Sequence, residues 1–119
     1  MREIPESDWK VFRKLREVAL ERFCERVIRE IGELTAGKPT SYHERYLEIF
    51  KLVDRRDDEL AHAFNNPRRS AALWQLAAIR SRGLITDEEL SRFTAATQEA
   101  VQMLSQPPDQ ARDHKRARL

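Results

Sequence analysis

The chain has 119 residues, of which 40% are hydrophobic and 35% charged, with three glycines, five prolines and one cysteine. A domain of this length buries about two-thirds of the surface of its unfolded chain, so a core can form without disulfides or a structural metal. The single cysteine excludes an intramolecular disulfide. No apolar run approaches the ~20 residues that cross a bilayer, so a membrane-embedded protein is excluded as well.

The first ten residues, MREIPESDWK, contain no apolar segment typical of a secretory signal. We therefore expect a cytoplasmic protein. Arginine outnumbers lysine by 17 to 5, a bias that favours a bacterial source with a GC-rich genome.

The net charge of +2 is confined to the end of the chain. Residues 1–104 contain 18 Lys and Arg against 18 Asp and Glu, and are therefore neutral. Residues 105–119 are too polar to fold alone and are predicted to be a disordered basic tail, with a helical domain over 1–104. The four cations of this tail are Arg112, Lys115, Arg116 and Arg118.

The first helix is predicted to begin at Ser7 or Asp8, whose side chains can cap the first turn, and to run to Leu34. Apolar residues recur every three or four positions, and the apolar stripe broadens along the sequence. This pattern fits either one long curved helix or two helices with a break near Val18 to Leu20. The segment TAGKPT ends the helix, with Gly37 as a left-handed cap and Pro39 blocking continuation.

The second helix is predicted from Tyr42 to about Phe64. Ser41 and Glu44 match a capping box at its start, and the NNP segment at 65–67 stops it. Its apolar positions recur at helical spacing and predict a buried stripe of Tyr46, Ile49, Phe50, Val53, Leu60 and Phe64.

The segment RRSAALWQLAAIRSRG at 68–83 predicts a third helix that is apolar on nearly every side. Such a helix belongs in the middle of a bundle, so we expect Trp74 in the centre of the core. A DNA-reading helix-turn-helix centred on Gly83 is disfavoured, because the next helix would present Asp87, Glu88 and Glu89 to the phosphates.

Two short helices are predicted to close the fold. Thr86 and Glu89 form a second capping box that opens a helix from Asp87 to about Arg92, and Thr94 can cap another from Ala95 to Leu104. The stretch GLITDEEL, from Gly83 to Leu90, resembles the helix-turn-helix segment of the short C-terminal domains appended to many bacterial proteins. This resemblance implies a corner between two helices and a role in protein association.

No motif for catalysis or cofactor binding is present, and we expect neither enzymatic activity nor a cofactor. Glu59 and His62 have the E-x-x-H spacing of paired-metal sites, but no second such pair exists, so no metal is expected. Cys24 lies among apolar positions of the first helix and is expected to pack as a small hydrophobic residue. Arg55 and Arg56 are predicted to pair with the acids around them on a solvated face.

The sequence thus predicts a compact all-α bundle of about five helices: two long, one apolar and central, and two short at the C-terminal end. The function that we expect is a non-catalytic protein interaction or regulatory module, whose partner is another protein or a second copy bound through the broad stripe of the first helix. Arg68 and Arg69, which have few acids beside them, are the candidate contacts for an acidic partner. The alternative is weak, salt-dependent nucleic-acid binding through the basic tail together with Arg68 and Arg69.

Overall fold

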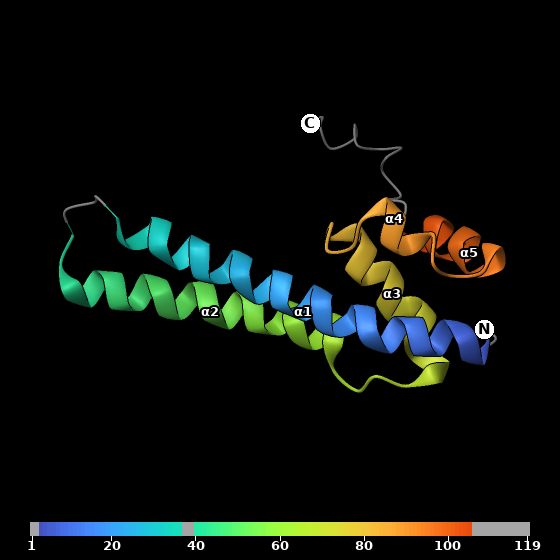
Figure 1. Cartoon of the computed structure of the whole chain (residues 1–119). Helices are drawn as coiled ribbons and strands as arrows, with labels where there is room; N and C mark the ends of the chain where they lie inside the picture. Colours follow the sequence, from blue (N-terminus) through green and yellow to red (C-terminus); the bar gives the residue numbers. More distant parts are fainter. Residues whose placement is uncertain (1–2, 37–39, 106–119) are drawn as a thin grey trace, which may run out of the picture.

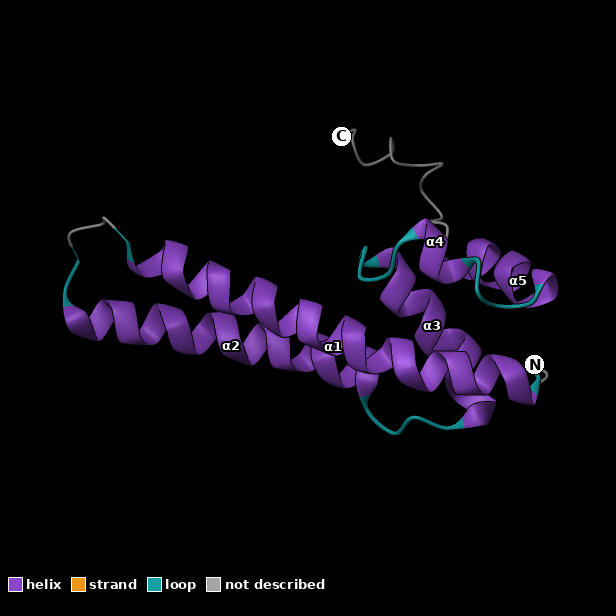
Figure 2. Cartoon of the chain, in the orientation of Figure 1, coloured by secondary structure: helices purple, strands orange, loops and turns teal. Residues whose placement is uncertain are grey.

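The computed structural model describes residues 3–36 and 40–105, and in these residues the fold is all-α, as predicted. Five α-helices and one short 3-10 helix (η1) follow one another without a strand (Figure 2). In chain order they are α1 (Glu6–Thr35), α2 (Tyr42–Phe64), η1 (Arg69–Ala71), α3 (Ala72–Ser81), α4 (Asp87–Leu90) and α5 (Ala95–Ser105).

The two long helices form an antiparallel hairpin, and the remaining helices form a head at one end of it (Figure 1). Helix α1 has 30 residues and is therefore about 45 Å long. The head, η1 to α5, packs against the N-terminal half of α1 and the C-terminal end of α2. The other half of the hairpin projects beyond the head, so the bundle has three or more layers only at one end.

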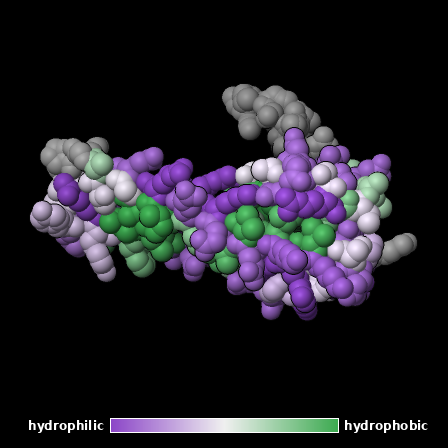
Figure 3. Space-filling model, viewed as in Figure 1, coloured by the Kyte–Doolittle hydropathy of each residue, from purple (hydrophilic) through white to green (hydrophobic). Residues whose placement is uncertain are grey.

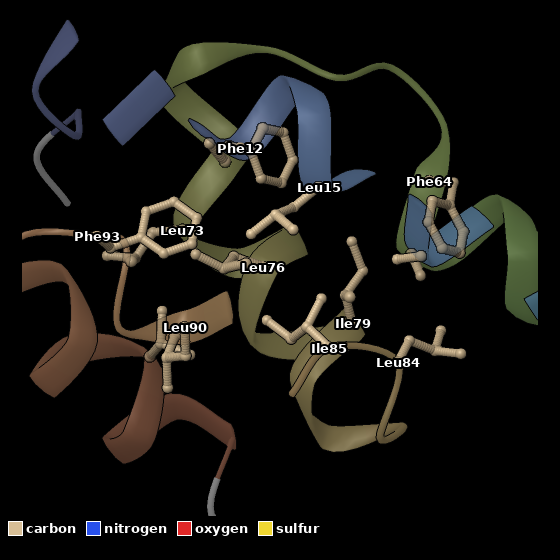
Figure 4. Packing of buried hydrophobic residues seen from close by; sticks show 14 of the residues in the cluster. Phe12, Leu15, Phe64, Leu73, Leu76, Ile79, Leu84, Ile85, Leu90 and Phe93 are labelled. Atoms are coloured by element: carbon tan, nitrogen blue, oxygen red, sulfur yellow. The ribbon is translucent and has the colours of Figure 1, made fainter. Parts of the chain in front are cut away.

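The core lies where the head meets the hairpin (Figure 4). Phe12 and Leu15 of α1 face Leu76 of α3, and Phe64 closes the end of α2. Burial of these side chains supplies most of the driving force for folding. The other buried members of the cluster are Ile4, Ala19, Phe23, Ala63, Ala72, Leu73, Ile79, Leu84, Ile85, Leu90, Phe93 and Val101.

Helix α1 is continuous, which decides between the two alternatives left by its sequence. Its start differs from the prediction, because Pro5 precedes the first turn and neither Ser7 nor Asp8 caps it. The Asp8 side chain is instead directed to α5, as described below. Gly37 and Pro39, predicted to end α1, lie outside the described residues.

Helix α2 has the predicted bounds, because both of its ends are set by local signals. The Ser41 hydroxyl accepts a hydrogen bond from the Glu44 backbone N–H at 3.0 Å. The helix ends at Phe64, before the Asn-Asn-Pro segment, and Asn66 adopts a positive φ of 52° there.

The corner between α3 and α4 also forms as predicted. Gly83 has a φ of 71°, in the left-handed region that favours glycine, and the Leu84 N–H reaches back to the Ile79 carbonyl. Thr86 and Glu89 make both hydrogen bonds of a capping box. Helix α4 ends at Leu90, two residues earlier than predicted. The apolar residues of the corner, Leu84, Ile85 and Leu90, are buried in the core.

Helix α3 is buried on most sides, but the prediction that Trp74 occupies the centre of the core is wrong. Trp74 is 54% exposed, whereas its polar neighbour Gln75 is buried and donates a hydrogen bond to the Asn65 carbonyl. The periodicity around Trp74 did not distinguish these positions, because almost every neighbour of Gln75 is apolar. The buried side of α3 is decided by where α1, α2 and α5 lie.

Trp74→Ala is expected to lower the free energy of unfolding by less than about 1 kcal/mol, because half of the ring is already in water. Denaturant titration measures this change. Leu76→Ala is the comparison within the same helix, since Leu76 is fully buried and should cost about 3 kcal/mol. Equal losses for the two variants would contradict this assignment.

Candidate functional site

The projecting half of the hairpin exposes a row of large apolar side chains. Tyr46, Phe50 and Val53, which the sequence predicted to be buried, are 66%, 60% and 42% exposed, so that prediction is wrong for them. On α1, Ile28 is 67% exposed beside them. Figure 3 shows a hydrophobic patch, in green, over this part of the hairpin. We call the surface formed by these residues the open face: Cys24, Ile28, Ile31, Tyr46, Phe50 and Val53.

The projecting half has no core of its own. Among the described residues, the last buried position of α1 is Phe23 and the first of α2 is Leu52. Every position of 24–35 and 42–51 is therefore at least partly exposed. A pair of helices can cover only part of its apolar surface by itself, and stable folds add a further layer. No element within residues 3–36 and 40–105 supplies that layer.

The open face points away from the head. Two arginines of α1 bind the head. Arg22 donates hydrogen bonds to Glu89 and to the Leu84 carbonyl. Arg26 donates to the carbonyls of Arg82 and Gly83. Cys24 and Ile28 each follow one of these arginines by two residues, which is about 200° around an α-helix. The head therefore leaves the open face accessible.

A shallow groove of about 210 Å³ runs along the open face between α1 and α2. Ile28 and Ile31 form one wall and Val53 and Leu60 the other, so the groove is largely apolar. Cys24 lies at its edge and is exposed, so the expectation that this thiol packs inside the protein is wrong. The sequence correctly places Cys24 beside apolar residues, but none of the described elements covers that side of α1.

Charged side chains beside the open face lack partners within the described residues. Asp54 and Asp57 are exposed, and the structure records no ion pair or hydrogen bond for either side chain. Asp57 lines the groove itself. An interface built on this face would therefore have carboxylates available for pairing.

The head is fixed to the hairpin by a pair of charges. Arg22 donates two hydrogen bonds to the Glu89 carboxylate, at 2.7 and 2.8 Å, and one to the Leu84 carbonyl at 2.8 Å. Bidentate pairs of this kind are among the stronger charged contacts in proteins. The hydrogen bond from Arg22, the largest cause, and that from the Thr86 backbone N–H together lower the pKa of Glu89 from 4.5 to about 2, against the opposing effect of burial.

A second polar contact joins the start of α1 to α5. The Asp8 carboxylate is 1% exposed and accepts hydrogen bonds from the Thr94 N–H and hydroxyl, at 2.9 and 2.7 Å, and from the Thr97 hydroxyl at 2.6 Å. A carboxylate at a helix N-terminus satisfies N–H groups that have no partner within the helix. Asp8 therefore fixes the position of α5 from a site 86 residues earlier in the sequence.

A third group of charges lies where α1, α2 and α3 meet. Arg56 binds Glu30 of α1 in a bidentate pair and Glu59 within its own helix, at 2.8 to 2.9 Å. Glu59 also accepts from Arg82 at 3.3 Å. The predicted pairing of Arg56 with a neighbouring acid is confirmed, and the contact with Glu30 joins the two helices.

The two residues of the E-x-x-H pair, Glu59 and His62, have different surroundings. Glu59 is engaged with two arginines, while the His62 side chain is exposed. No group of three or more His, Cys, Asp or Glu side chains suited to a metal ion occurs within residues 3–36 and 40–105.

The two arginines proposed for an acidic partner have different surroundings. Arg69 donates to Glu6 at 3.1 Å and to the Ile4 carbonyl at 3.0 Å, so it already has partners in the chain. Arg68 is exposed. Binding of a partner by this pair stays a prediction. The four basic residues proposed for nucleic-acid binding, Arg112, Lys115, Arg116 and Arg118, lie outside the described part of the chain.

Within the described residues, none of the helices combines the length and the apolar character needed to cross a bilayer. Comparison of the chain with protein-family models, with curated proteins and with solved structures yields no match. The local likeness of Gly83 to Leu90 to a bacterial C-terminal domain accordingly stays a resemblance.

Proposed function

We propose that the chain is a non-catalytic helical interaction module, which presents the open face of its hairpin to a protein. The observation that carries this proposal is the exposure of Ile28, Tyr46 and Phe50 on a half-hairpin without a buried residue. Aromatic rings contribute about 150–250 Å² each when fully exposed, so Tyr46 and Phe50 alone leave roughly 250 Å² uncovered. With Ile28 and Val53 beside them, the patch reaches the roughly 300–600 Å² of the largest apolar patch on a typical monomer, which is often a functional site.

The rest of the fold suits this role because it holds the hairpin rigidly at one end. The core and the contacts of Asp8 and Arg22 connect the head to α1. A rigid base reduces the entropy that the open face would lose on binding. The compartment expected from the sequence, the cytoplasm, belongs to this proposal.

The competing function, nucleic-acid binding, has less support in the described residues. Residues 3–36 and 40–105 contain 16 Lys and Arg against 18 Asp and Glu. Phosphate binding requires an excess of cations on a surface, and its affinity falls as salt rises. Only the basic tail and Arg68 favour that function.

The test compares two valines of equal exposure on the hairpin. Val53 lies on the open face and is 42% exposed, whereas Val18 lies on α1 outside that face and is 40% exposed. The wild-type chain and Val18→Glu should form a complex, with themselves or with a protein from the source cells, in sedimentation and affinity capture. Val53→Glu should not.

Failure of all three chains to form any protein complex would contradict the proposal. Salt-sensitive binding of duplex DNA that survives in Val53→Glu and disappears when residues 105–119 are deleted would favour nucleic-acid binding instead.

A further inference from the structure

We propose that the partner of the open face is a second copy of this chain, bound antiparallel so that two hairpins form a four-helix bundle. This inference rests on the proposed function and names the partner. In the dimer, the missing layer of each hairpin is supplied by the hairpin of the other copy. Paired hairpins of this kind follow the usual packing of helical bundles.

The shape of the open face suits a contact between two copies of the chain. A twofold interface must be self-complementary, because the same surface contributes to both sides. The open face offers both halves of such a contact: Phe50 and Tyr46 protrude from α2, and a groove lined by Ile28, Ile31 and Val53 lies beside them. Aromatic side chains that enter apolar pockets are the usual anchors of protein interfaces.

The size of the surface and the position of the head also fit a dimer of hairpins. Four large apolar side chains of the open face are between 42% and 67% exposed, which supplies several hundred Å² of the ~800 Å² per partner that standard interfaces bury. They are Ile28, Tyr46, Phe50 and Val53. Because the head lies on the other side of α1, two open faces can meet without a clash between heads, which take opposite ends of the dimer.

The test is the mass of the purified full chain in sedimentation over a wide range of concentration. Wild-type protein should reach the mass of two chains, twice 14.0 kDa, and dissociate on dilution. Val53→Glu should weaken the dimer at least tenfold and Val18→Glu should not. Because both side chains are already partly in water, both variants should retain the helical content of the wild type, as measured by circular dichroism.

A chain that stays monomeric at every concentration overturns the homodimer. If that monomer binds another protein and Val53→Glu abolishes the binding, the proposed function stands and only the identity of the partner changes. If it binds no protein, both proposals fail.

Discussion

Asp8→Ala is expected to lower the free energy of unfolding by about 3 kcal/mol, one of the two largest effects of a single polar substitution in this chain. The carboxylate is buried and accepts three hydrogen bonds from Thr94 and Thr97. Its removal leaves three donors at the start of α5 without their acceptor. Buried donors without a partner cost more than the net gain of the hydrogen bonds themselves.

The adjacent residue provides the control for this substitution. Ser7 lies in the same first turn but is exposed, so Ser7→Ala should change the free energy of unfolding by less than about 0.5 kcal/mol. Denaturant titration measures both variants. Asp8→Asn should fall between them, because its single oxygen can accept from only part of the three donors. A loss below about 1 kcal/mol for Asp8→Ala would show that α5 does not depend on this contact.

Arg22→Met is expected to cost about 3 kcal/mol, because it removes the cation from the Glu89 carboxylate, whose side chain is only 11% exposed. Methionine keeps much of the aliphatic part of the side chain, so the loss reports mainly on the charge. Arg29→Met is the matched control. Arg29 also pairs with a glutamate, Glu25, but both side chains of that pair are exposed, and exposed pairs contribute little.

The same pair makes stability depend on pH in the acid range. Glu89 has a pKa of about 2 in the folded chain and 4.5 ordinarily, so the unfolded chain takes up a proton first as the pH falls. The stabilisation is therefore complete above pH 4.5 and is lost between 4.5 and about 2. It amounts to about 2–3 kcal/mol after allowance for the partly exposed Arg22. In Arg22→Met this part of the acid dependence should largely disappear, and an unchanged pH profile would contradict the assignment.

The elements that the sequence predicted well are those with local signals at their ends. Helix α2 has the predicted bounds because Ser41 caps its first turn and the segment from Asn65 to Pro67 stops it. The corner at Gly83 likewise depends on residues that are neighbours in the sequence. Gly83 adopts the positive φ, and Thr86 and Glu89 form the capping box that follows it. Such features require no knowledge of the rest of the fold.

The predictions that failed concern contacts between distant parts of the chain. Periodicity shows that α2 has an apolar side, and Phe50 and Val53 are on it, but it does not show whether another element covers that side. Trp74 was misplaced for the same reason. Asp8 was predicted to cap the first turn of its own helix, α1, whereas it binds the start of α5. Its partners there, Thr94 and Thr97, are more than 80 residues away in the sequence. The open face could therefore be found only once the position of the head was known.

The central claim is that the open face is covered in the functional protein, and the thiol of Cys24 tests it most directly. Cys24 is the single cysteine of the chain and lies at the edge of the groove, exposed in the isolated chain. The measurement is its rate of reaction with a maleimide in concentrated protein, in dilute protein and in Val53→Glu. Slow labelling is expected in concentrated wild-type protein, and fast labelling after dilution or in the variant. Equal, fast labelling in all three samples, and in an extract of the source cells as well, would contradict it.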